Sequence, residues 1–280
     1  MYQVTAASEV IDSLNEDWRS FATANTNHTP ARVVLEHNQP LAIGTFWRNP
    51  LHPNPFRFEY RLGNDRDVGA LTPLLAALTT SAESDASTPI HFIAREQEFD
   101  LVAWAHAHDF KQIMKTWNAE LLPNSVKAPA FDGIHRLVDT DSTELRHRLA
   151  LLHAQIYSNA HHWNPPGSSI TESAELLFMG EDVLPEFLWY VTDQAGEPIG
   201  VSSLRRSDLP AHMELGWLGT CPDVSEEIHR RLLDTALAAA GDNIVLIETD
   251  ANESRTLARL RELPVDWGHA MIRFERRVLT

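Results

Sequence analysis

The segment from Glu214 to Leu233, ELGWLGTCPDVSEEIHRRLL, has residue types that raise the question of phosphate binding. Its first part reads as an apolar strand that breaks at Gly219 and Pro222, and a helix follows. The unpaired amides and the dipole at a helix start favour an anion. At this start, however, Ser225 is followed by the carboxylates of Glu226 and Glu227, which suit an ordinary helix N-terminus and would repel a diphosphate.

Histidines and the cysteine are the other reactive side chains with a suggestive context. His161 and His162 are adjacent, so their rings point in different directions and form a poor metal site by themselves. With Tyr157 and Trp163 they could line an acceptor pocket, or they could belong to a surface loop with a packed tryptophan. Cys221 is interpreted as a small structural residue, because the glutamates that follow oppose the effect of a helix start on its pKa.

The composition limits the classes of partner. The net charge is -16 and the pI is about 5.2, so the long-range field repels nucleic acid and anionic membranes and favours cationic partners. One cysteine excludes an intramolecular disulfide. The sequence shows neither a signal peptide nor a membrane-spanning apolar run, and motifs of serine hydrolases, P-loop proteins and Rossmann folds are absent. We expect a cytoplasmic protein.

The hydrophobic pattern predicts the same order of elements twice. In the first half the predicted elements are a helix at 7–22, strands at 31–37, 41–48 and 56–63, a helix at 65–82, a strand at 89–96, a helix at 99–108 and a strand at 110–121. In the second half they are a strand at 133–140, helices at 143–158 and 171–180, strands at 186–193, 197–206 and 212–219, a helix at 226–240, a strand at 243–250, a helix at 254–263 and a strand at 269–278. Thr143 is the predicted cap of its helix.

Residue matches support a duplication. QPLAIGT from Gln39 parallels EPIGVSS from Glu197, FEYRLG from Phe58 parallels MELGWLG from Met213, and IHFIA from Ile90 parallels IVLIE from Ile244. The offsets are 197-39 = 158, 213-58 = 155 and 244-90 = 154. Prolines and small residues interrupt the pattern at 121–133, so we predict domains at 1–125 and 131–280.

The second half, with ELGWLGTCPD before one helix and IETDANES before LARLREL, resembles the GNAT superfamily of acyl-CoA-dependent N-acyltransferases. The resemblance covers nearly the whole chain as two copies and looks most like the bacterial tandem-GNAT arrangement. It implies an α+β fold, in which two tandem copies of a mixed, mostly antiparallel sheet are flanked by helices in three layers. It also implies acetyl-CoA as cosubstrate.

In that family the end of the fourth strand contacts pantetheine, an Arg/Gln-x-x-Gly-x-Gly/Ala loop holds the pyrophosphate, and a turn after the next strand bears an asparagine. The positions that match these features are Leu62, Gly63, Arg66 and Gly69 in the first half and Leu218, Gly219, Thr220 and Asn252 in the second. The second loop departs most from the pattern, because Ser225, Ile228 and Arg230 replace the cation, the first glycine and the last small residue. The first loop has Leu71 at its last small position. The resemblance therefore slightly favours residues 66–71.

Catalysis in the family uses a glutamate on the fourth strand as base and often a tyrosine on the last helix as acid. Glu59 and Glu214 occupy matching strand positions, so either is a candidate base, and either could equally be a surface or ion-paired carboxylate. Neither final helix has a tyrosine, and His106 and His108 are the titratable residues there.

Two functions remain open on this basis. The first is an N-acyltransferase that moves an acyl group from acetyl-CoA to a small or peptide amine, with a cationic acceptor suited to the acidic chain. The second is a catalytically silent tandem-GNAT protein that binds a ligand or partner, which the missing glycines and tyrosines favour.

Overall fold

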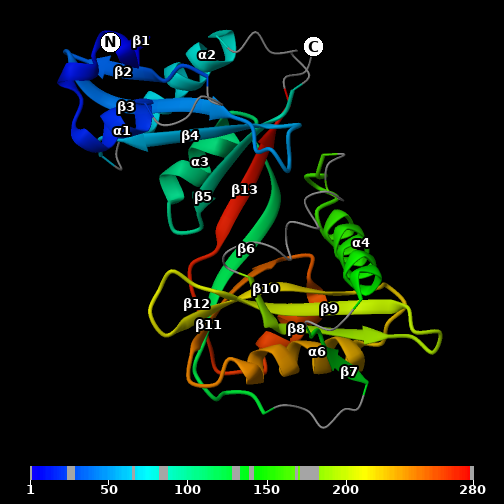
Figure 1. The fold of residues 1–280 in the computed structure, drawn as a ribbon. Helices are drawn as coiled ribbons and strands as arrows, with labels where there is room; N and C mark the ends of the chain where they lie inside the picture. The colour runs from blue at the N-terminus through cyan, green and yellow to red at the C-terminus, as the bar shows by residue number, and fades with distance from the viewer. Residues whose placement is uncertain are drawn as a thin grey trace. The chain divides into compact units, whose positions relative to one another are not determined.

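The computed structural model describes residues 2–23, 29–64, 67–81, 88–127, 133–138, 142–167, 170 and 183–277 (Figure 1). The chain forms two compact units. The N-terminal unit contains Met1–Lys115 and Met271–Thr280, and the C-terminal unit contains Thr116–Ala270. Each unit is a mixed sheet flanked by helices, which confirms the predicted fold class. None of the described helices is long and apolar enough to cross a membrane.

The sheet of the N-terminal unit is antiparallel except at one pair of strands. Its strands, in spatial order, are β1 (Gln3–Ala6), β2 (Arg32–Glu36), β3 (Gln39–Trp47), β4 (Phe56–Leu62), β5 (Ile90–Arg95) and β13 (Met271–Arg276). Only β4 and β5 run parallel. Its helices are the 3₁₀ turns η1 (Ala7–Glu9), η2 (Ile11–Ser13) and η3 (Asp67–Ala70) and the α-helices α1 (Glu16–Thr23), α2 (Leu71–Ser81) and α3 (Phe99–Ala107). The predicted strands at 31–37 and 41–48 are confirmed as β2 and β3, which pair as an antiparallel hairpin.

The predicted helix at 7–22 is wrong in its first half. Val10 leaves the helical region (φ -127°, ψ 14°) and Leu14 is extended, so the chain forms two 3₁₀ turns before α1. The side chain of Asn15 then accepts a hydrogen bond from the Trp18 amide at 2.8 Å and starts α1. Strand β1, which pairs with β2, was not predicted.

The C-terminal unit has the same architecture. Its strands, in spatial order, are the second part of β6 (Lys111–Leu121), β11 (Ile244–Asp250), β10 (His212–Thr220), β9 (Pro198–Arg206), β8 (Val183–Thr192) and β7 (Ile134–Arg136), and β12 (Val265–Trp267) also pairs with β6. Its helices are α4 (Thr143–Ala160), α6 (Glu226–Ala239) and α7 (Ser254–Leu260). Ser142, rather than Thr143, caps α4 by accepting from the Leu145 amide. The helix predicted at 171–180 lies outside the described residues.

Each sheet receives its last strand from the other half of the sequence. Strand β13, red in Figure 1, pairs with β5 of the N-terminal unit from Met271↔Arg95 to Arg276↔Ile90. The part of β6 from Thr116 to Leu121 pairs with β11 of the C-terminal unit. The compact units therefore do not follow the sequence halves, and the ranges 1–125 and 131–280 stay a prediction about the duplication.

Both units have a dense apolar core. In the N-terminal unit, α2 buries Leu71, Leu74, Leu75 and Leu78 against the sheet, together with Phe92 and Phe274. In the C-terminal unit, α6 packs its leucines on one face of the sheet, with Trp189 and Leu204, while α4 packs Leu149 on the other face with Leu188 and Val201. The C-terminal sheet is thus the middle of three layers.

The strand exchange predicts that a residue near the end of the chain stabilises the N-terminal unit. Phe274 is fully buried there, and its ring contacts Phe92 and His106. Phe274→Ala should lower the free energy of unfolding by about 3–5 kcal/mol through lost burial and the cavity left behind. Hydrogen exchange should rise in β5 and change little in β9, whereas the exposed Arg277→Ala serves as control. Unchanged protection in β5 would contradict this role.

Candidate functional site

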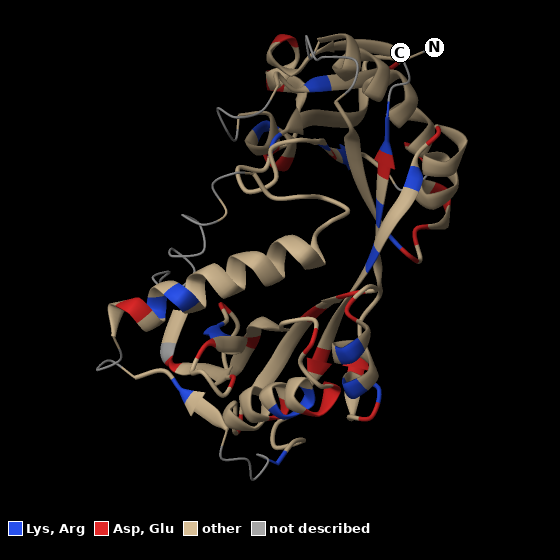
Figure 2. Ribbon diagram, turned by 90° about the vertical axis from the view of Figure 1, so that its right-hand side faces the viewer, with Lys and Arg blue, Asp and Glu red and all other residues tan. Residues whose placement is uncertain are grey.

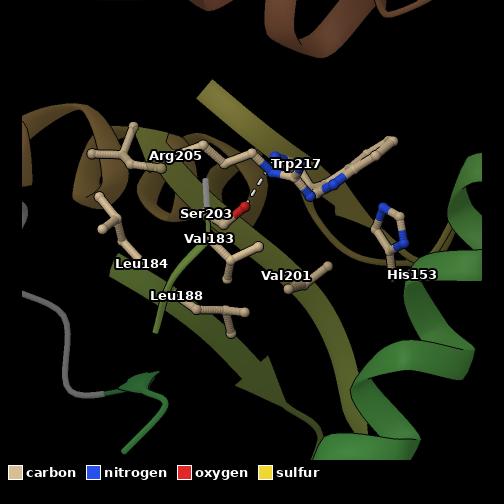
Figure 3. Close-up of a pocket in the computed structure, with 9 residues that line it drawn as sticks. His153, Val183, Leu184, Leu188, Val201, Ser203, Arg205 and Trp217 are labelled. Atoms are coloured by element: carbon tan, nitrogen blue, oxygen red, sulfur yellow. Dashed lines mark hydrogen bonds between the residues drawn. The ribbon is translucent and has the colours of Figure 1, made fainter. Parts of the chain in front are cut away.

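A β-bulge in β10 is the centre of the candidate site. Leu215 pairs with Leu204 of β9 and Leu218 pairs with Ser202, so Gly216 and Trp217 together face Ser203. The Trp217 amide donates a hydrogen bond to Ser203 Oγ at 3.1 Å, which Figure 3 draws as a dashed line. One residue too many on β10 is the definition of a bulge, and bulges bend and twist their strand.

The N-terminal unit lacks this feature. Strands β3 and β4 keep one register from Ala42↔Leu62 to Trp47↔Arg57. The difference was visible in the sequence, because FEYRLG from Phe58 has one residue fewer than MELGWLG from Met213. The bulge is therefore an insertion in the second half or a deletion in the first.

Beyond Glu214 the two central strands of the C-terminal unit separate. Strands β10 and β11 run parallel and pair only from His212↔Ile244 to Glu214↔Leu246. The rest of β10 borders three grooves, all within this unit. We call them the acidic groove, beside Glu214; the strand groove, between the bulge and the end of β11; and the loop groove, beside Gly219 and Thr220.

The acidic groove has a volume of about 520 Å³ and is lined by carboxylates from four strands. They are Glu120 of β6, Glu214 of β10, Glu248 of β11 and Asp266 of β12. Glu214, one of the two predicted bases, is exposed. Figure 2 shows acidic residues on the strands of this unit, whereas α4 has no Asp, Glu, Lys or Arg from Leu149 to Ala160. Such a groove attracts cations.

The strand groove, of about 290 Å³, is lined by Leu215 to Leu218, by the end of α4 and by Glu248, Asp250 and Glu253. Tyr157 of α4 and His161, which follows the helix, both line it, and their rings stack with centroids 4.0 Å apart. Tyr157 also meets Trp217 edge to face at 5.0 Å. The structure thus brings Tyr157 and His161 to the groove, whereas His162 is exposed.

His153, for which the sequence suggested no role, packs against Trp217 of the bulge. Its ring lies edge to face against Trp217 with centroids 4.1 Å apart, beside a small cavity of about 10 Å³ that Figure 3 shows. It is 3% exposed, and among the described residues neither ring nitrogen has a hydrogen-bond partner. Burial, with smaller contributions from Arg205 and His161, lowers the pKa of His153 to about 3. The ring is therefore neutral.

The turn between β11 and α7 contains Asn252, a predicted contact of the cosubstrate. Its amide donates to the carbonyl of Ala160 at 2.7 Å, so it holds the end of α4, and it also lines the loop groove. The next residue, Glu253, accepts from the Asp250 amide at 2.9 Å and from Thr249, and burial raises the pKa of its carboxyl. Glu98 accepts from the Arg95 amide at the same turn of the other unit, which supports the duplication, since 253-98 = 155.

The start of α6 is capped by its own sequence. Ser225 Oγ accepts from the Ile228 amide at 3.3 Å, and Glu227 forms an ion pair with Arg231 at 2.5 Å. In the loop before it, the Cys221 amide donates to Ile199 and the Val224 amide donates to Cys221. These amides are engaged within the protein and are not available to a phosphate.

In the N-terminal unit, the described site residues contact neighbouring groups of the protein. Leu62 ends β4, the Gly63 amide donates to Leu41, and Gly69 lies in η3 beside the Tyr2 hydroxyl. Arg66 lies outside the described residues. Glu59 is 3.8 Å from the Arg61 guanidinium.

Aromatic rings fill the face of β4 and β5 in this unit. Tyr60 stacks on Phe92 with centroids 5.5 Å apart, and Phe58 also contacts Phe92. Strands β4 and β5 also separate, because they pair only at Phe56↔Ile90 and Arg57↔His91. The bulge therefore distinguishes the C-terminal unit. Of the predicted residues, the structure brings Glu214, Leu218, Gly219, Thr220 and Asn252 together along its grooves.

Each unit is a mixed sheet whose fourth strand separates from the fifth, and in the C-terminal unit the fourth strand is also bulged. Two such sheets in one chain are the architecture of the GNAT (GCN5-related N-acetyltransferase) fold in tandem. Solved structures agree. A GCN5-related N-acetyltransferase from Sphaerobacter thermophilus is similar with a TM-score of 0.68 at 15% identity, over 100% of this chain and 96% of that chain. A tandem GNAT protein from the clavulanic acid biosynthesis pathway is similar with a TM-score of 0.56 at 13% identity, over 100% and 99%.

A third similar structure is the GCN5-related glucosamine N-acetyltransferase region of a fungal multi-domain β-N-acetylglucosaminidase. Its TM-score is 0.65 at 10% identity, over 99% of this chain and 38% of that chain. No protein-family model and no curated protein matches the sequence. At these identities the likeness establishes the fold.

His153 makes the stability of the C-terminal unit depend on pH. An unfolded histidine gains its proton below its ordinary pKa of 6.5, whereas folded His153 stays neutral down to about pH 3. Stability is therefore full above pH 6.5 and falls as the pH drops, by up to about 1.4 kcal/mol per pH unit. His153→Phe keeps a ring against Trp217 and removes this loss. Between pH 7.5 and 5, urea unfolding of the wild type should lose about 2 kcal/mol more than the variant; equal losses would refute the assignment.

Proposed function

We propose that the C-terminal unit transfers an acyl group from acetyl-CoA to a cationic small or peptide amine. The observation that carries this proposal is the open edge of β10 beyond Glu214, where the pairing with β11 ends and the strand groove begins. An extended chain with amide groups, such as a pantetheine arm, can add to an open strand edge as a further strand would. The carboxylate of Glu214 lies at the end of that edge that borders the acidic groove, where the cationic amine would bind.

The residues of the C-terminal unit fit acyl-CoA along β10 but not at the start of α6. The strand groove would hold the uncharged pantetheine arm between Leu218 and α4, and Glu248, Asp250 and Glu253 also line this groove. The start of α6 would repel a diphosphate, because Ser225 already caps it and Glu226 and Glu227 follow. When bound, acetyl-CoA would supply the activated thioester.

The chain's own groups would supply positioning and proton transfer. The acidic groove concentrates ammonium groups, and Glu214 accepts the proton that makes the amine a nucleophile. The amine nitrogen then forms the C–N bond while the C–S bond breaks, and the departing thiolate takes up a proton. Tyr157, which lines the strand groove, is the candidate donor of that proton.

Cosubstrate binding is the first test of this function. The thermal midpoint should rise with millimolar acetyl-CoA, because a ligand at 100 times its Kd stabilises the native state by about 2.7 kcal/mol. Calorimetric titration gives the Kd independently. An unchanged midpoint together with no heat of binding would refute acyl-CoA dependence in both units.

Glu214→Gln tests the base. The substitution keeps size and exposure but removes the proton acceptor, so kcat should fall about 100-fold or more while the Kd for acetyl-CoA is unchanged. Glu197→Gln, an exposed partner of Arg148 remote from the grooves, is the control. A comparable loss in Glu59→Gln, with Glu214→Gln active, would move the chemistry to the N-terminal unit.

A catalytically silent tandem-GNAT protein is the second candidate function. The capped start of α6 and the stacked rings Tyr60 and Phe92 favour it, because neither arrangement resembles a pyrophosphate or pantetheine site. Acetyl-CoA binding without turnover of any primary amine, di- and polyamines and lysine peptides included, would support this alternative.

A further inference from the structure

Arg255 is a half-buried cation at the edge of the loop groove, which has a volume of about 250 Å³. It is the second residue of α7 and reaches back across the groove. Its Nη1 donates to Thr220 Oγ1 at 3.3 Å, and its Nη2 donates to the carbonyl oxygen of Pro222 at 3.1 Å. Both partners are neutral, and the contact to Thr220 is longer than an ordinary N–H···O hydrogen bond.

Arg255 has no carboxylate partner among the residues that the structure describes. Other arginines of the same unit do. Arg259 binds both carboxylate oxygens of Asp234, at 2.7 and 3.1 Å, and Arg148, Arg230 and Arg231 bind Glu197, Glu262 and Glu227. The chain has 39 acidic and 23 basic residues, so carboxylates are plentiful. A half-buried guanidinium without one of them nearby therefore favours the binding of an anionic ligand.

The surroundings of Arg255 are suited to an anion. The groove also exposes the polar, uncharged side chains of Asn159 and Ser254. Its one carboxylate in the described lining, Glu253, is half-buried and accepts hydrogen bonds from the Asp250 amide and Thr249. The charge of Arg255 is felt by its neighbours, since burial and Arg255 together lower the pKa of His229 to about 4.

The loop groove continues the strand groove, because Leu218 and Ala160 line both. A ligand that extends along β10 therefore reaches Arg255 directly after it passes Thr220. The guanidinium offers five donors in a planar fork that matches phosphate, and its two contacts leave most of them for a ligand.

We propose that Arg255 binds the phosphate groups of a ligand in the loop groove, so that the diphosphate of the acyl-CoA lies against α7 and not on the start of α6. This inference rests on the proposed function for the identity of the ligand. The ligand class it requires is a phosphate ester or a diphosphate.

The test is calorimetric titration of CoA, pantetheine and inorganic pyrophosphate into the full chain. Arg255→Ala should weaken binding of CoA and of pyrophosphate about 10-fold or more, because charge-assisted hydrogen bonds are lost, and should leave pantetheine binding unchanged. Arg255→Lys should bind with intermediate affinity. Arg261→Ala, an exposed arginine at the end of the same helix, should match the wild type.

His229 gives a second readout that a merely structural role of Arg255 would not change. Its ring contacts Thr220 and Thr256, and Arg255 is the charged group that faces it. Pyrophosphate at Arg255 should raise the pKa of His229, measured by NMR, in the wild type but not in Arg255→Gln. Circular dichroism of each variant confirms that the fold is retained.

The outcomes separate this inference from the proposed function. Wild-type affinity of Arg255→Ala for CoA would overturn the inference and leave the acyltransferase proposal intact. Arg255-dependent binding of pyrophosphate by a protein that binds neither CoA nor pantetheine would refute the acyltransferase and acyl-CoA as the ligand, and would support Arg255 as a phosphate-binding residue. A wild-type protein that binds neither CoA nor pyrophosphate would overturn both.

Discussion

The hydrogen bond from the Trp217 amide to Ser203 Oγ is the interaction on which the candidate site depends. A bulge leaves one backbone amide without its ladder partner, and an unpaired buried amide is costly. The Ser203 hydroxyl replaces the missing carbonyl, and His153 packs beneath the indole. The stabilised bulge bends β10 close to Glu214, where its pairing with β11 ends. In the N-terminal unit β4 also separates from β5, beyond Arg57, but its ladder with β3 is regular and aromatic rings occupy the corresponding face.

Charge is distributed unevenly along the grooves beside β10. At the Glu214 end, four carboxylates face the acidic groove, and at the Thr220 end Arg255 faces the loop groove. Between them the strand groove is lined by aromatic rings and β10 in one part and by Glu248, Asp250 and Glu253 in another. A positively charged acceptor and a negatively charged donor would thus approach from opposite ends and meet at the bulge. The strongly negative net charge of the chain hides this polarity, because one arginine contributes little to the sum.

The sequence predicted what local patterns determine. The hairpin of β2 and β3, the junction of β10 and α6, and the self-capped start of α6 follow from apolar periodicity and from Ser225, Glu226 and Glu227. The extra residue of the bulge is present in the sequence as the seventh residue of MELGWLG, but only the pairing register with β9 identifies it as a bulge. No sequence pattern indicates the role of Arg255, because its neighbours Thr220 and Pro222 lie more than thirty positions earlier in the chain. The helix at 7–22 failed because amphipathic spacing cannot show that Val10 and Leu14 leave the helical region.

The strand exchange has a consequence for how this protein is made. During synthesis on the ribosome, the N-terminal sheet lacks β13 until residues 271–276 have been translated. Until then the edge of β5 has unpaired backbone groups and is prone to aggregation. The C-terminal sheet, by contrast, has β6 ready from the start. The later half of the polypeptide therefore completes its sheet first, against the usual N-to-C order of co-translational folding. Any event that separates the halves, such as proteolysis between them, would leave two fragments that each need the other's strand to fold.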